Sequence, residues 1–141
     1  MIVYSAINSF ELQNEMQLAD WIKFVIHQEN RRLGEINYIF CDDSYLLDIN
    51  IKELKHNTLT DIISFDYTVG DVVSGDIYIS TERVHENAED LKNSFSEELH
   101  RVIIHGVLHY CGYKDKTDEE KSEMRSKEDY YLSLRTFEIE Q

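Results

Sequence analysis

The stretch from His105 to Asp115, HGVLHYCGYKD, is the part of the chain that most constrains its fold. Residues 102–110 are mostly apolar and predict a buried helix. On that helix His105 and His109 are four positions apart, so they lie on one face about one turn apart. Gly112 favours a helix end and a chain reversal, which would bring Asp115 back toward the two imidazoles. The stretch therefore predicts a core helix that ends in a cluster of metal ligands.

Two imidazole nitrogens and one carboxylate form a ligand set that suits zinc and leaves a fourth position for water. We therefore expect one Zn²⁺ per chain, or another divalent transition metal, held by His105, His109 and Asp115. Cys111 is the alternative third ligand, but it follows His109 by only two residues and would point away if the helix continues. The alternative to a metal site is a pair of histidines packed in the core beside an aspartate on the surface.

The ligand spacing resembles the HExxHxxGxxH layout of the metzincin proteases, with aspartate in place of the third histidine. The protease motif carries a glutamate general base directly after its first histidine, where this chain has Gly106. General acid–base steps typically contribute about 10²–10⁴-fold to a rate, so the protease reading loses an essential part. A water activated by the metal can still attack a phosphodiester, with the metal or nearby cations stabilising the developing charge.

The rest of the chain predicts strands and helices interleaved around one sheet. Strands are expected at 2–4, 35–41, 60–66 and 75–80, and helices at 12–33, 44–54, 81–93, 95–110 and 118–134. Arg31 and Arg32 fall in the last turn of the first helix, and Leu46, Leu47, Ile51 and Leu54 face inward on the second. We predict an α+β fold: one domain over residues 1–141, with a small mixed β-sheet packed with about five helices.

The charge balance limits the partners. Fourteen basic residues stand against 28 acidic ones, a net charge of −14, so any contact with nucleic acid must be local. One small cationic cluster, Lys52, Lys55 and His56, could meet a phosphate; the alternative is solvated charges at a helix end. Cys41 and Cys111 predict reduced thiols in a cytoplasmic protein, and no apolar run is long enough to span a membrane.

With these motifs in view, the chain resembles the YbeY family of bacterial ribosomal RNA maturation factors. The family hallmark HGxLHLxGYDH matches residues 105–115, the family's TDVLSF resembles residues 60–65, and its GDI strand matches residues 75–77. Asn50 also matches. The resemblance implies a cytoplasmic, zinc-dependent endoribonuclease specific for single strands. Its implied roles are maturation of the 3′ end of the small-subunit ribosomal RNA and ribosome quality control, without a dinucleotide cofactor or a membrane partner.

Three departures from the family pattern bear on the site. Asp115 replaces the third histidine, Lys114 stands where aspartate is usual, and Leu54 stands where the family commonly has an arginine. We expect Lys52, Lys55 or His56 to take over the phosphate contact of that arginine. Arg101 and Lys114 are candidates to assist catalysis, with solvated charges as the alternative.

Two other functions stay open at this point. One is a ribosome-associated assembly factor with a mainly structural metal, because an acidic surface suits basic ribosomal proteins better than RNA. The other is a zinc protease, which rests on the ligand spacing alone.

Overall fold

The computed structural model describes residues 1–55 and 58–137. Its single sheet has the strand order β1-β2-β4-β3, made by β1 (Ile2–Ala6), β2 (Arg32–Cys41), β4 (Val72–Ser80) and β3 (Ile62–Asp66). Strands β1, β2 and β4 run parallel, and β3 pairs antiparallel with β4 at one edge of the sheet. The sheet is therefore mixed, as predicted.

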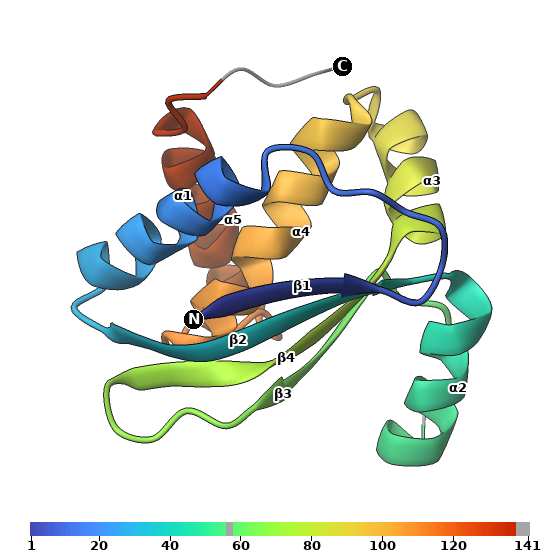
Figure 1. Cartoon of the computed structure of the whole chain (residues 1–141), viewed down its shortest axis with the longest axis horizontal. Coiled ribbons are helices and arrows are strands. Elements are labelled where there is room, and N and C mark those ends of the chain that lie inside the picture. The colour runs from blue at the N-terminus through green and yellow to red at the C-terminus, as the bar shows by residue number, and fades with distance from the viewer. Residues whose placement is uncertain (56–57, 138–141) are drawn as a thin grey trace.

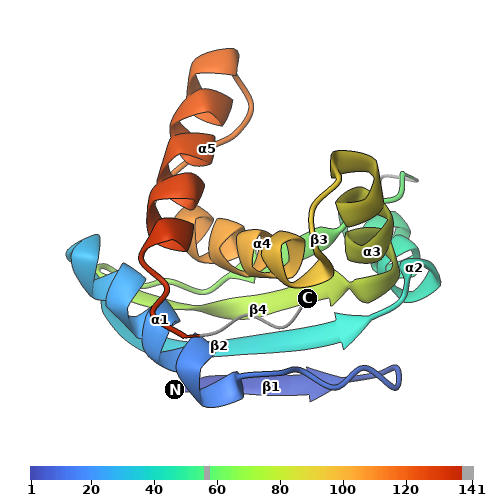
Figure 2. The same cartoon turned by 90° about the horizontal axis from the view of Figure 1, so that it is seen from above.

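Helices cover the two faces of the sheet unequally. Four lie on one face: α1 (Glu15–Gln28), α3 (Thr81–Leu91), α4 (Phe95–Tyr110) and α5 (Asp118–Ser133), whereas α2 (Asp43–Leu54) lies near one end of the other face (Figures 1 and 2). Side chains along each strand point alternately to the two faces of the sheet. Tyr38 and Phe40 therefore enter the main core, whereas Cys41 packs on the other face with Leu46 of α2. The predicted α+β class with about five helices is confirmed for the described residues. None of the helices in this part of the chain is long and apolar enough to cross a membrane.

Helix α4 is the central element of the larger core. Ser94 caps its first turn by accepting a hydrogen bond from the Glu97 amide at 3.1 Å. Ile103, Ile104, Val107 and Leu108 are fully buried. A Cβ atom at Gly106 would lie 2.9 Å from Ile77 and 3.2 Å from Ile62, so glycine lets α4 approach the sheet closely. The position that lacks the protease glutamate therefore faces the sheet.

Two local predictions are wrong. Helix α1 ends at Gln28, Asn30 adopts a left-handed conformation, and Arg32 already belongs to β2, so neither arginine lies in a helical turn. The strand extends this far because Arg32 pairs with Val72 of β4. On α2, Leu46 is buried, but Ile51 and Leu54 are 48% and 44% exposed, because only one edge of this helix meets the sheet.

Candidate metal centre

The chain reversal after α4 brings the third candidate ligand to the first two. The amide of Gly112 donates to the carbonyl of His109 at 3.0 Å, and the amide of Tyr113 donates to the carbonyl of Leu108 at 3.1 Å. This pair of hydrogen bonds is a Schellman motif, and the positive φ of 103° at Gly112 is the conformation that favours glycine there. The turn directs the following residues back along α4 toward the histidines.

His105, His109 and Asp115 converge on one point. The two Nε2 atoms are 3.1 Å apart, and Asp115 Oδ2 lies 3.2 Å from His105 Nε2 and 3.3 Å from His109 Nε2. Ligand atoms of a tetrahedral zinc site with bonds of about 2.0–2.2 Å lie about 3.3–3.6 Å from one another, and the observed separations of 3.1–3.3 Å lie within about 0.2 Å of the lower end of this range. The three atoms are therefore spaced as one zinc ion, or a metal of similar size, requires.

The second nitrogen of each imidazole fixes its orientation. His105 Nδ1 lies 2.6 Å from Glu128 Oε2, and His109 Nδ1 lies 2.9 Å from the carbonyl oxygen of Tyr113. Both oxygens accept hydrogen bonds, so each Nδ1 carries a proton and each Nε2 of a neutral ring presents a lone pair. Two lone pairs and a carboxylate facing one another at about 3 Å repel unless a cation lies between them. The donor set thus fits a divalent metal.

Glu128 is held in place by an arginine. Arg101 donates from Nη1 to Glu128 Oε1 at 2.9 Å and from Nη2 to Asp129 Oδ1 at 2.6 Å. Glu128 is 4% exposed, so its charge needs these partners. Burial disfavours the charged form of His105, but the hydrogen bond that its Nδ1 donates to Glu128 and the negative charges of Glu128 and Asp115 outweigh burial and raise the His105 pKa. The site is therefore built to hold positive charge.

The ligands line an open pocket of about 580 Å³. Its walls come from α4, from α5 and from the segment around β3; the lining residues are Thr60, Asp61, Ile62, Ser64, Glu98, Arg101, Val102, His105, His109, Asp115, Lys121, Met124, Arg125 and Glu128. Burial raises the pKa of Asp61, and burial together with the charge of Asp61 raises the pKa of Glu98. A substrate can thus reach the metal position along a cleft whose inner wall is acidic.

The structure places the other predicted residues unequally around this pocket. Arg101 lines it, whereas Lys114, Lys52 and Lys55 are exposed and lie outside its lining. Lys52 pairs with Asp48 at 3.0 Å. Cys111 is buried and caps α4. His56 lies outside the described residues.

Sequence reasoning did not assign Glu128, the Tyr113 carbonyl or Asp61 to the site. Glu128 left a signal: it lies four positions after the apolar Met124 and three before the apolar Tyr131, so on a helix it shares their face, where a buried carboxylate needs a partner. Asp61 stood in a recognised motif without an assigned task. The carbonyl of Tyr113 belongs to the main chain, so the amino-acid type at this position does not predict its contact with His109.

The fold and the cluster define a class: a small α+β protein whose core helix presents two histidines and a returning carboxylate at an open pocket. Comparisons with known proteins narrow this class. The family model described as Endoribonuclease YbeY matches residues 5–135. The Endoribonuclease YbeY of Flavobacterium psychrophilum is 60% identical over 95% of this chain and 96% of its own length. That of Flavobacterium johnsoniae is 56% identical over the whole of both chains.

A solved structure agrees with the sequence relatives. The solution structure of a Thermotoga maritima protein matches with a TM-score of 0.67 and 27% identity, covering 94% of this chain and 87% of that one. The chain belongs to the Endoribonuclease YbeY family, which confirms the resemblance drawn from the residues 60–65, 75–77 and 105–115.

Proposed function

We propose that the protein is a zinc-dependent endoribonuclease that hydrolyses phosphodiester bonds of single-stranded RNA. The observation that carries this proposal is the convergence of His105, His109 and Asp115 within 3.3 Å at an open pocket, in a chain of this family. The pocket favours a catalytic site over a purely structural one, because structural zinc sites are closed by four protein ligands.

The residues divide the work as follows. His105, His109 and Asp115 hold the metal, which when bound supplies Lewis acidity that activates water and offsets phosphate charge. Glu128 and the Tyr113 carbonyl keep each imidazole oriented with its Nε2 toward the pocket. Arg101 fixes Glu128, and its side chain is only 15% exposed. We assign it a positioning role first, and leave Lys114 as a subsidiary candidate for contact with the substrate.

The natural substrate in this proposal is the 3′ end of the small-subunit ribosomal RNA, with a further role in ribosome quality control. The partners are then the small ribosomal subunit and its proteins, the compartment is the cytoplasm, and residues 1–141 act as a single domain. Relatives that are 60% and 56% identical carry the name Endoribonuclease YbeY, which supports RNA as the substrate class.

The test uses purified protein, its metal content and a labelled single-stranded RNA from the 3′ end of the small-subunit ribosomal RNA. We expect about one zinc per chain and cleavage that chelator removes and zinc restores. A double-stranded version of the same RNA should remain intact. Parent protein that binds no transition metal, or a His109→Ala variant that keeps full metal and activity, would contradict the proposal.

The cluster at the end of α2 has its own test. Lys52 and Lys55 are proposed to take over the phosphate contact of the family arginine, together with His56. A Lys52→Ala/Lys55→Ala/His56→Ala variant should then raise the KM for RNA; unchanged RNA cleavage would remove the cluster from the site.

A second function is favoured by the charge of −14, which suits basic ribosomal proteins. In this alternative the protein is an assembly factor and the metal is structural. Complementation of a deletion strain separates the two functions: an Asp115→Ala/His109→Ala protein that still sediments with ribosomal particles and fully restores ribosomal RNA processing would favour assembly over catalysis.

A further inference from the structure

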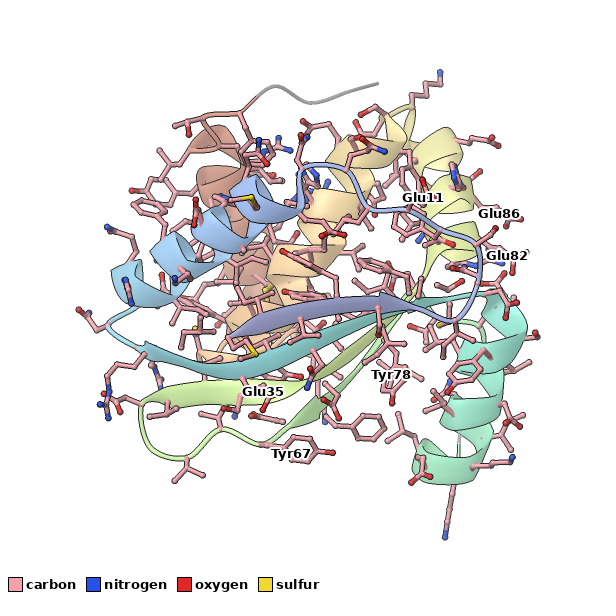
Figure 3. All side chains as sticks on the ribbon, viewed as in Figure 1. Glu11, Glu35, Tyr67, Tyr78, Glu82 and Glu86 are labelled. Carbon is pink, nitrogen blue, oxygen red and sulfur yellow. The ribbon has the colours of Figure 1, made fainter. Side chains whose placement is uncertain are left out.

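The strongly acidic surface raises the question of what holds an RNA strand. Exposed carboxylates of Glu11, Glu82 and Glu86 gather near the end of the molecule that carries α3 (Figure 3). The inner wall of the pocket adds the carboxylates of Asp61 and Glu98. Phosphates are repelled by such a field unless unpaired cations lie beside the reaction site.

Arg101 does not meet this need. It lines the pocket, but both ends of its guanidinium group are occupied by Glu128 and Asp129, at 2.9 and 2.6 Å. Its charge is therefore largely offset before a substrate arrives, and moving it would release Glu128 from its orientation against His105.

Two other cations line the same pocket. Lys121 and Arg125 are exposed, and they are four positions apart on α5, so they project from one face about one turn apart. Among residues 1–55 and 58–137, neither has a carboxylate oxygen within ion-pairing distance. The charge of Arg125 nevertheless reaches into the pocket, because it acts on the buried carboxyl group of Glu98.

The pocket lining also includes Thr60, Asp61, Ile62 and Ser64 from the segment around β3, where Asp61 is the charged member. Glu98 Oε1 is buried and has no hydrogen-bond partner among residues 1–55 and 58–137, so it does not hold Arg125. The pocket lining thus carries two cations on α5 without an ion-pair partner among the described residues, and the carboxylates of Glu98 on α4 and Asp61 beside β3.

We propose that Lys121 and Arg125 form a phosphate-binding pair that holds the RNA strand along α5, beside the scissile phosphate at the metal. This inference rests on the proposed nuclease function and adds the side of the pocket along which the strand runs. The pair binds the substrate and does not take part in bond cleavage, so its loss acts on KM and leaves kcat nearly unchanged.

The experiment compares three zinc-loaded proteins on one fluorescent single-stranded RNA: the parent, Lys121→Gln/Arg125→Gln, and Lys23→Gln/Lys92→Asn. The last variant removes the same charge from exposed positions outside the pocket. We expect the α5 variant to raise KM about tenfold or more, with kcat within about twofold. The slope of log kcat/KM against log salt should fall by about 1.4, which is about 0.7 for each of two phosphate contacts on a single strand.

The control variant should keep the parent's KM and slope. A KM and a salt slope in the α5 variant that match the parent, or an equal change in the control variant, would contradict phosphate binding by Lys121 and Arg125. Fluorescence anisotropy separates this failure from failure of the nuclease proposal. If the parent binds the RNA without cleaving it, the nuclease proposal fails and the pair is judged on Kd alone, by the same tenfold criterion. If the parent does not bind the RNA, both fall.

Discussion

The two halves of α4 carry histidines with opposite surroundings. His100, in the first half, is 3% exposed, and its Nδ1 faces Arg135 Nη1 at 2.7 Å, so this nitrogen must accept. In the second half, the Nδ1 atoms of His105 and His109 face a carboxylate and a carbonyl, so they must donate. His100 is therefore kept neutral in the core, whereas the other two turn a lone pair toward the pocket.

This contrast shows that the group facing Nδ1, more than the helix itself, determines the protonation and the role of each histidine. Burial and the positive charge of Arg135 lower the pKa of His100 to about 4. His105 has the raised pKa described above, although it lies on the same helix only five residues later. Arg135 and Glu128 both come from the C-terminal part of the chain, which packs along α4.

The largest effect should follow from removing a ligand in the second half. His105→Ala leaves two ligands and a buried Glu128 that has lost its imidazole partner. We expect loss of stoichiometric zinc and of RNA cleavage, measured by metal analysis and gel assay. Circular dichroism checks the fold. A matched change at the exposed His85 of α3, His85→Ala, should keep both properties.

The first half of α4 should contribute to the pH dependence of folding stability and not to metal binding. The pKa of His100 is lower in the folded state than the unfolded value of 6.5, so the unfolded state binds more protons between pH 6.5 and about 4. Stability is therefore full above pH 6.5 and falls as the pH drops, by up to about 3 kcal/mol for this shift. Urea unfolding of the parent and of His100→Gln at pH 7.5 and 4.5 measures it. If both proteins lose the same stability between pH 7.5 and 4.5, His100 is not the group responsible.

A smaller effect is expected at the carboxylate behind His105. Glu128→Gln keeps an acceptor for Nδ1 but removes the charge that pairs with Arg101. Partners of this kind are typically worth about 10–100-fold in metal affinity. Isothermal titration with zinc should show a loss in that range, while the exposed Glu123→Gln on the same helix binds zinc as the parent does. An unchanged Kd would reduce Glu128 to a packing role.

The smallest effect belongs to His109, whose acceptor is main chain. Tyr113→Phe removes the hydroxyl that donates to Glu29 at 2.7 Å but retains the carbonyl that receives the proton of His109. Zinc affinity should change by less than about threefold, because the acceptor itself is kept. A loss as large as that of Glu128→Gln would mean that the loop position depends on the Tyr113–Glu29 contact.

Sequence reasoning reached the features that depend on local spacing. The helical register aligns His105 and His109, and glycine at 112 reverses the chain, both as predicted. It failed where distant pairing decides: β2 extends to Arg32 because β4 lies beside it, and Ile51 stays exposed because α2 meets the sheet along one edge. The Glu128 contact spans 23 residues, which no local pattern encodes.

The central claim is that one metal held by three side chains makes this pocket a nuclease. Titrating zinc into the metal-stripped protein while following cleavage of the single-stranded RNA tests it most directly. Activity should rise and level off at about one zinc per chain, and Asp115→Ala should show no rise over this range. Cleavage by the metal-stripped protein, or an Asp115→Ala titration that matches the parent, would contradict it.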